Sequence, residues 1–448
     1  MNMTQSSRYI LVAVLCFVAG AIFGRLSVPQ PELKNSQLQV SKEAVVKTYG
    51  RFGRGAPTTF EAVETKEPAP VSLLSPPVSA DTKADISELA EGNNPTLCSD
   101  QKGECFAAFE AKSKGSKVKD ILFSKSTDAA RTWSAPVNVS KTAGKAGHPA
   151  IAFEKNGAID LAWSDCASSQ KTSAIFFARS ADGGKVWSKP MEISNTTGVC
   201  SSPALAISPD NSLNVVWKDT SSGETHPDIF YTVSNDAGKN WSKAKDISNT
   251  PGVSSDPCIA VSEDAVVHVA WLDTTPGVKR PDIFYNWASN GSWNKPINVS
   301  NSPRFSAHPS LACGAGGKVF VAWSDNSIKE HAADIWCAVS QKAGEFSQAR
   351  NLSDSPGVSS EPMIVADNFG RVAAVWSDTS NNGVQNIFAS MSFDALTKVS
   401  SAMDLTDSKF ISKQPCVSLG SDNMVLVWEQ VDGDKSTVKA MSKGFPHH

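Results

Sequence analysis

Seven polar residues, each directly before a proline, carry the side chains in this sequence best suited to bind a ligand. They recur at intervals of 52 to 54 residues and differ in type: Asn94, His148, Ser202, Asp256, His308, Glu361 and Gln414. Imidazole and carboxylate groups bind polar ligands and can coordinate divalent metals. We take His148, Asp256, His308 and Glu361 as candidate ligand-binding residues; the alternative is that these residues are hydrated loop ends. The two histidines stand three repeats apart, so we assign no metal site and no cofactor.

A tryptophan motif sets the spacing of these residues. Ala162-Trp163-Ser164-Asp165 is repeated around Trp217, Trp271, Trp323 and Trp376, with a diverged copy at Trp428. In the copy over residues 196–248, strand-like segments at 204–207, 212–217, 228–233 and 243–248 are separated by clusters rich in Ser, Asn, Asp, Gly and Pro. Four short strands in a repeat of about 53 residues predict one blade of a β-propeller.

The number of blades follows from the prolines that open the first strand of each repeat. There are seven: Pro95, Pro149, Pro203, Pro257, Pro309, Pro362 and Pro415. The last copy has no fourth strand, but residues 84–87 match one, so we expect an N-terminal strand to complete this blade and close the ring. The prediction is an all-β, seven-bladed propeller over residues 80–445. The pre-proline residues should then ring the channel mouth, with His226, Arg280 and Arg304 as further candidates on the same face.

A second motif lies between the third and fourth strands. Copies run from Ser126 to Trp133, from Ser180 to Trp187 and from Ser234 to Trp241, with eroded versions at 289–293 and 340–346. In each full copy an Asp (Asp128, Asp182, Asp236) can accept from backbone N–H groups, and a tryptophan can pin the turn. The motif resembles the Asp-box of the sialidase-like propellers. This resemblance implies that the boxes are structural turns away from the active face, and the Asp of each Trp-x-Asp is likewise a repeat feature.

The resemblance does not extend to the sialidase catalytic set. Sialidases hold the substrate carboxylate with three arginines and use a tyrosine nucleophile. Only Arg280 and Arg304 are placed to reach the candidate face, while Tyr231 and Tyr285 occupy one repeated strand position. We therefore assign no catalytic residue.

The N-terminal segment is expected to direct export. Residues 9–24 are apolar and uncharged, which suits a signal anchor or a cleaved signal peptide within residues 1–28. Residues 29–79 have the composition of a proline-rich linker. We expect a membrane-anchored chain with its propeller outside the cytoplasm; the alternative is secretion or periplasmic release after cleavage.

Cysteines and charge add further expectations. Cys98 could bond to Cys105 across a hairpin, and Cys166 to Cys200 between loops of one face. The net charge of −3 gives no footprint for nucleic acid.

Three functions fit these patterns. We favour a non-catalytic propeller that binds a protein or a glycan on its channel face, because repeats build rigid recognition surfaces and no catalytic set is evident. A glycoside hydrolase or other hydrolase is the first alternative, and would require paired carboxylates in a deep pocket. A structural envelope or assembly protein is the second.

Overall fold

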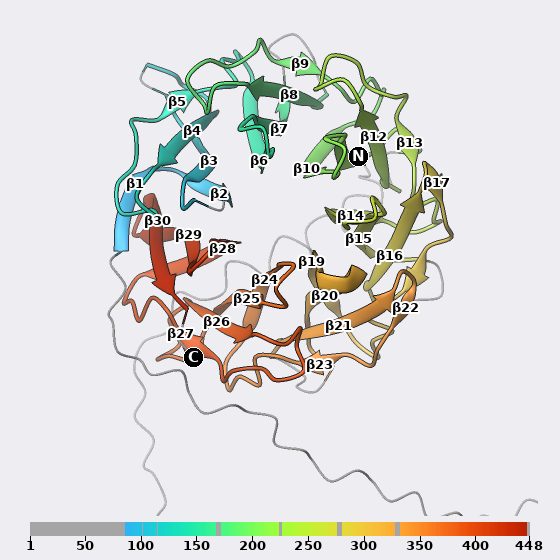
Figure 1. Cartoon of the computed structure of the whole chain (residues 1–448), viewed down its shortest axis with the longest axis vertical. Coiled ribbons are helices and arrows are strands. Elements are labelled where there is room, and N and C mark those ends of the chain that lie inside the picture. Colours follow the sequence, from blue (N-terminus) through green and yellow to red (C-terminus); the bar gives the residue numbers. More distant parts are fainter. Residues whose placement is uncertain are drawn as a thin grey trace, which may run out of the picture. The chain divides into compact units, whose positions relative to one another are not determined.

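Seven β-sheets are arranged in a ring (Figure 1), and the cavities along its axis form a central channel. The computed structural model describes residues 86–100, 102–113, 115–166, 172–223, 226–275, 280–327 and 332–445. Each sheet has four main antiparallel strands, and the first strands of neighbouring sheets contact one another around the channel. The predicted seven-bladed propeller is confirmed. The apolar segment and the proline-rich linker predicted before residue 80 lie outside the described residues.

The strands follow the same order in every blade. The first three blades contain β2 (Asn93–Ser99), β3 (Cys105–Ala111), β4 (Asp120–Ser126), β5 (Val137–Asn138); β6 (Lys145–Phe153), β7 (Ile159–Cys166), β8 (Ala174–Ser180), β9 (Met191–Glu192); and β10 (Cys200–Ile207), β11 (Leu213–Asp219), β12 (Asp228–Ser234), β13 (Lys245–Asp246). The fourth and fifth contain β14 (Ser254–Val261), β15 (Val267–Asp273), β16 (Asp282–Ser289), β17 (Ser292–Trp293), β18 (Ile297–Asn298); and β19 (Ser306–Gly314), the 3₁₀ turn η3 (Ala315–Gly317), β20 (Lys318–Asp325), β21 (Asp334–Lys342), β22 (Glu345–Phe346), β23 (Arg350–Asn351).

The last two blades contain β24 (Ser359–Ala366), β25 (Val372–Asp378), β26 (Asn386–Ser392), β27 (Met403–Asp404); and β28 (Ile411–Leu419), β29 (Asn423–Asp432), β30 (Lys435–Gly444), β1 (Ile86–Glu91). The strand β1 pairs with β30, so an N-terminal strand completes the last blade as expected. Ser87 on β1 also donates to the carbonyl of Ala130 at 2.6 Å, which ties the closing strand to the first blade. Among the described residues no helix is long and apolar enough to cross a membrane.

The tryptophans of the second strands form the core between blades. All six are fully buried. In five blades the indole Nε1 donates to the Asp two residues later, at distances from 2.8 Å (Trp217 to Asp219) to 3.3 Å (Trp163 to Asp165). In the seventh blade Gln430 replaces the Asp, and the buried Nε1 of Trp428 has no partner. The Asp of Trp-x-Asp therefore serves the scaffold, as predicted.

The Asp-boxes close tight turns with their own side chains. In the box of the third blade, Ser234 donates to Asp236 at 2.9 Å and accepts from the N–H of Gly238, while Asp236 accepts from the N–H of Asn240 at 2.8 Å. The same bonds recur in the boxes of Asp128 and Asp182. The eroded copies instead form the hairpins β16–β17 and β21–β22.

A fourth box, at Ser392 and Asp394, makes the same contacts and was not predicted. It carries Val399 where the other boxes carry tryptophan, so the pattern that marks the motif is lost while its hydrogen bonds remain.

Neither of the two predicted disulfides is formed in the structure, where all eight described cysteines are free. Cys98 lies opposite Phe106, and Ser99 lies opposite Cys105. Since neighbouring residues of a strand point to opposite faces, Cys98 and Cys105 project from opposite sides of the blade. Cys200 is buried and its thiol contacts Asp219 at 3.3 Å, whereas Cys166 is exposed. Burial raises the pKa of the Cys200 thiol to about 12, so it is not a ready nucleophile.

Candidate functional site

Each first strand contains a β-bulge that turns one side chain into the channel. In all seven blades the pairing of first and second strands shifts by one residue at the pre-proline position, as between Ser201 and Ala204. The pre-proline residue adopts a left-handed conformation in every blade, with φ between 49° and 53°. Bulges of this kind re-aim a side chain. None of the seven is a glycine, so each carries a backbone strain of about 1–3 kcal/mol.

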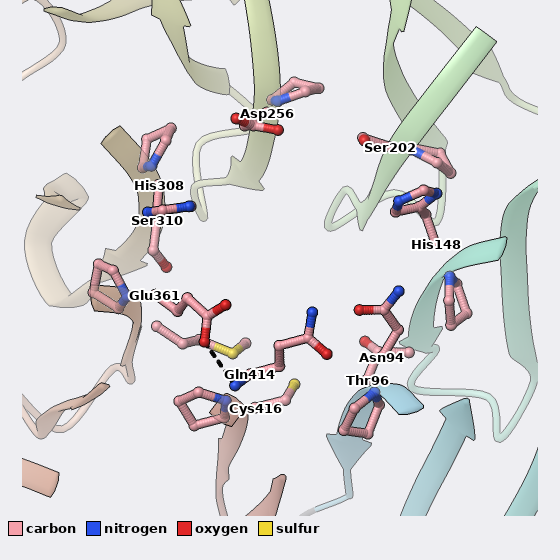
Figure 2. A pocket seen from close by; sticks show the side chains of 18 residues that line it. Asn94, Thr96, His148, Ser202, Asp256, His308, Ser310, Glu361, Gln414 and Cys416 are labelled. Atoms are coloured by element: carbon pink, nitrogen blue, oxygen red, sulfur yellow. Dashed lines mark hydrogen bonds between the residues drawn. The ribbon is translucent and has the colours of Figure 1, made fainter. Parts of the chain in front are cut away.

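The seven side chains surround one cavity at the channel mouth. Its volume is about 430 Å³, and it is lined by the seven pre-proline residues, their prolines and four residues that follow them: Thr96, Ser310, Met363 and Cys416. Figure 2 shows the labelled side chains of Asn94, His148, Ser202, Asp256, His308, Glu361 and Gln414 arranged around this opening. The predicted ring is therefore present, and it brings His148, Asp256, His308 and Glu361 to a single cavity.

Polar residues of the second strands hold several ring members in place. The hydroxyl of Ser164 lies 3.3 Å from Nδ1 of His148, and that of Ser324 lies 3.4 Å from Nδ1 of His308. Each serine donates to a carbonyl of its own first strand, so it can receive the imidazole N–H. Both serines occupy the variable position of Trp-x-Asp, which links the core motif to the cavity.

Two carboxylates join neighbouring blades: Glu361, which belongs to the ring, and Glu110, which does not line the cavity. Glu361 accepts from the backbone N–H of Gln414 at 2.9 Å (Figure 2) and from Ser377 at 3.2 Å. Glu110 accepts from the N–H of His148 at 2.9 Å and from the amide of Asn94 at 2.6 Å. Each carboxylate thus fixes the strained residue of the next blade.

Glu110 is ionised in this position although it is only 4% exposed. Burial raises the pKa of its carboxyl, but hydrogen bonds from Asn94, His148 and Lys119 outweigh that effect and lower the pKa overall. Sequence reasoning missed Glu110 because its blade carries Phe109-Glu110-Ala111 in place of Trp-Ser-Asp. Aligning the first blade with the others by its opening proline would have found it.

The mouth carries two carboxylates, whereas the side chains of the channel below it are mostly aliphatic. Asp256 and Glu361 line the cavity, and no lysine or arginine does. Deeper in the channel the first strands present aliphatic side chains such as Ile151, Leu205 and Leu311. The carboxylate and imidazole side chains of the channel are therefore gathered at the mouth. Within the described part of the chain, no three His, Cys, Asp or Glu side chains are grouped closely enough to hold a metal ion.

Three predicted ligand residues do not reach the cavity. His226 and Arg280 lie between second and third strands, and Arg304 lies before β19; none of the three lines the cavity. Two other arginines are committed elsewhere. Arg179 pairs with Glu154 and Asp160, and Arg371 pairs with Asp367. No arginine lines the mouth cavity, so it contains no part of a sialidase-type triad.

The two tyrosines are sheet residues, as predicted. Tyr231 donates to Asn214 at 2.7 Å, and burial raises the pKa of its hydroxyl to about 12. The hydroxyl of Tyr285 lies 2.6 Å from Nδ1 of His268, and burial raises the pKa of Tyr285 as well. Burial lowers the pKa of His268 to about 4, so its imidazole is a neutral partner within the blade. Neither tyrosine lines the mouth.

Comparison with known families agrees with this architecture. Residues 75–321, more than half of the chain, match the BNR repeat-like domain. The chain belongs to the BNR repeat-like domain family. The family match ends within β20, whereas the repeats continue to the seventh blade. No curated protein sequence matches the chain significantly.

Solved structures show the same fold in other proteins. A protein of unknown function from Dyadobacter fermentans is 15% identical with a TM-score of 0.50, over 69% of this chain and 98% of that one. A PL25 ulvan lyase bound to -[GlcA(1-4)Rha3S]- is 12% identical with a TM-score of 0.56, over 81% and 96%. A Hadza microbial sialidase is 13% identical with a TM-score of 0.47, over 79% and 66%. At these identities the likeness extends to the fold alone.

Proposed function

We propose that this BNR-type propeller is a non-catalytic recognition protein that binds a protein or glycan ligand at its channel mouth. The observation that carries the proposal is the ring of seven bulged residues around one cavity. Cavities of 300–1,000 Å³ with a few convergent polar groups are typical ligand sites.

The ring combines a constant backbone with varied side chains. The backbone is the same in all seven blades, with a bulge, a positive φ and a proline. The side chains are an amide, an imidazole, a hydroxyl or a carboxylate, according to the blade. A glycine would adopt the same φ without strain. Because the same bulge forms with six different residue types, it depends on no particular side chain, and the varied side chains are available for recognition.

A catalytic role is the second candidate, and two observations favour it. The cavity contains two imidazoles and two carboxylates, which are the usual acid and base groups. The fold is also similar to that of an ulvan lyase. Against this, the ligand in that enzyme's structure contains a uronic acid and a sulfated sugar, and such anions are normally held by arginine or lysine. No arginine, lysine or tyrosine lines the cavity here.

Export and anchoring complete the proposal. Residues 1–28 would hold the chain in a membrane, with the propeller outside the cytoplasm. Protease added to spheroplasts, whose cytoplasmic membrane is closed, should degrade the propeller. If degradation occurs only after the cytoplasmic membrane is broken, this part of the proposal is wrong.

The function is tested by screening the full-length chain against a glycan array, a random peptide library, and glycosidase and polysaccharide lyase substrates. Binding without turnover is the expected result, and it should be lost in a His148→Ala/His308→Ala variant that unfolds at the wild-type urea concentration. Turnover that depends on Asp256 or Glu361 would establish the enzyme instead. Binding unaffected by the double variant would place the site elsewhere.

A further inference from the structure

Apolar side chains recur on the face of the mouth in five of the seven blades. Four of the eight exposed large hydrophobic side chains among the described residues occupy one position of the repeat, three residues before the ring: Val199, Phe305, Val358 and Ile411. Their exposed fractions are 42–47%. Val253, at the same position of the fourth blade, is half-buried. We call these five residues the apolar collar; it spans the third to the seventh blades, and the first two blades carry Glu91 and Lys145 there.

The collar is held rigidly at the end of the channel where the ring lies. The backbone N–H of Val199, of Val253 and of Val358 each donates to a threonine hydroxyl just beyond the second strand, at 2.8 or 2.9 Å. That of Phe305 donates to the side chain of Asn326 at 3.0 Å. These contacts use only the backbone of the collar residue, so a polar side chain would serve the scaffold equally well.

Exposed apolar side chains that recur at one end of the channel, blade after blade, indicate a surface that is covered by a partner. On the opposite face, at the turn between β24 and β25, Phe369 is 78% exposed but has no equivalents in the other blades. The clustering is therefore specific to the mouth. Aliphatic side chains together with a single phenylalanine suit the apolar side chains of a polypeptide.

The negative charge of the mouth indicates that the part of the partner that enters it is positively charged. Asp256 is exposed and is contacted by Ser255, and Glu361 is contacted by Ser377 and the N–H of Gln414. Among the described residues neither carboxylate forms an ion pair, and the cavity lining adds no cation. In Figure 2 the two carboxylates lie on either side of His308 at the edge of the opening. A lysine or arginine side chain entering from above would be neutralised there.

We infer that the occupant of the mouth is a polypeptide segment of a partner protein, with a lysine or arginine that enters the cavity and apolar neighbours that pack on the collar. This inference rests on the proposed function and names its ligand. Apolar contact supplies the buried area, and the charge pair fixes the register of the segment.

The experiment uses the full-length chain and a library of randomised nonapeptides, acetylated and amidated at their ends. Enriched sequences should contain one Lys or Arg flanked by Val, Leu, Ile or Phe. For such a peptide, Asp256→Asn and Glu361→Gln should each weaken binding about tenfold. Phe305→Ser and Ile411→Ser should each weaken binding about fivefold.

Matched controls lie on the opposite face. Phe369→Ser removes a ring that is more exposed than that of Phe305 (78% against 47%), and Asp422→Asn removes an exposed carboxylate; both should leave affinity unchanged. Enrichment of acidic peptides, or of peptides with no basic residue, would overturn the inference. So would binding that is insensitive to the collar. Glycan binding lost in His148→Ala/His308→Ala with no peptide binding would refute this inference and leave the proposed function intact. Absence of both would refute the two together.

Discussion

The Asp-box turns and the channel mouth are both repeated features of this propeller, but they use their side chains in opposite ways. In the Asp-boxes the residue types are constant, and Ser and Asp side chains bond to their own turn. At the mouth the backbone is constant, and the side chains vary and point into a cavity. In a repeat protein, constant side chains therefore indicate scaffold, and varied side chains on a constant backbone indicate a recognition surface.

The largest difference between the two kinds of position is expected in the free energy of unfolding. Trp217→Ala removes a fully buried ring and should lower the free energy of unfolding by about 3–5 kcal/mol. His308→Ala removes an exposed side chain and should change it by less than about 0.5 kcal/mol. Urea unfolding followed by tryptophan fluorescence measures both, and Trp217→Ala is also followed by circular dichroism because it removes a fluorophore. Equal losses would mean that the ring is part of the scaffold.

The same substitution, serine to alanine, can be made in an Asp-box and at the mouth. Ser234 is buried in an Asp-box, where it donates to Asp236 and accepts from Gly238, so Ser234→Ala should cost about 1–2 kcal/mol. Ser202 has the same side chain at the mouth, and Ser202→Ala should be neutral in urea unfolding. If Ser202→Ala proves as costly, the mouth is scaffold.

The diverged seventh blade supplies a third test. Trp376→Phe loses the 3.1 Å hydrogen bond from the indole to Asp378, whereas Trp428→Phe removes a buried donor that has no partner. The first substitution should therefore cost about 1 kcal/mol more than the second by urea unfolding. Equal costs would show that the indole bond to Asp contributes nothing to stability.

The smallest expected effect is a dependence on pH. Hydrogen bonds from the side chain and backbone of Thr132 lower the pKa of Asp128 to about 2, and contacts with Asn240 do the same for Asp236. A free Asp has a pKa of about 3.9. Both therefore stabilise the fold fully above pH 4, and the contribution is lost as the pH falls through 2. Asp128→Asn should make the fall in unfolding free energy over this range shallower. An unchanged slope would mean that the box does not hold its carboxylate.

The architecture could be predicted from the sequence because the same core residues recur in each repeat. The spacing of the Trp-x-Asp motif predicted the blades. The prolines predicted how many blades there are and which residues form the ring, because a bulge places the same position at the channel in each blade. Features that occur in a single blade were harder to predict from the sequence. The Ser392 box was missed because Val399 stands where the other boxes have tryptophan. Glu110 was missed because Phe109 stands where the other blades have the tryptophan of Trp-x-Asp.

Predictions that required knowing where a side chain points failed for a physical reason. Cys98 and Cys105 are close along a hairpin, yet the alternation of the strand separates their thiols. Arg280 and Arg304 belong to loops of the mouth face, but strand geometry does not fix loop side chains, and neither lines the cavity. The ring could be predicted because each of its residues lies within a strand, where the geometry of the backbone sets the direction of the side chain.

The most direct measurement is an isothermal titration of the full-length chain with the best ligand from the glycan or peptide screen, comparing wild type with His148→Ala/His308→Ala. The expected result is loss of binding in the double variant with unchanged urea unfolding, because both imidazoles line the cavity and neither supports the core. Wild-type affinity in that variant would contradict the assignment of the channel mouth as the recognition site.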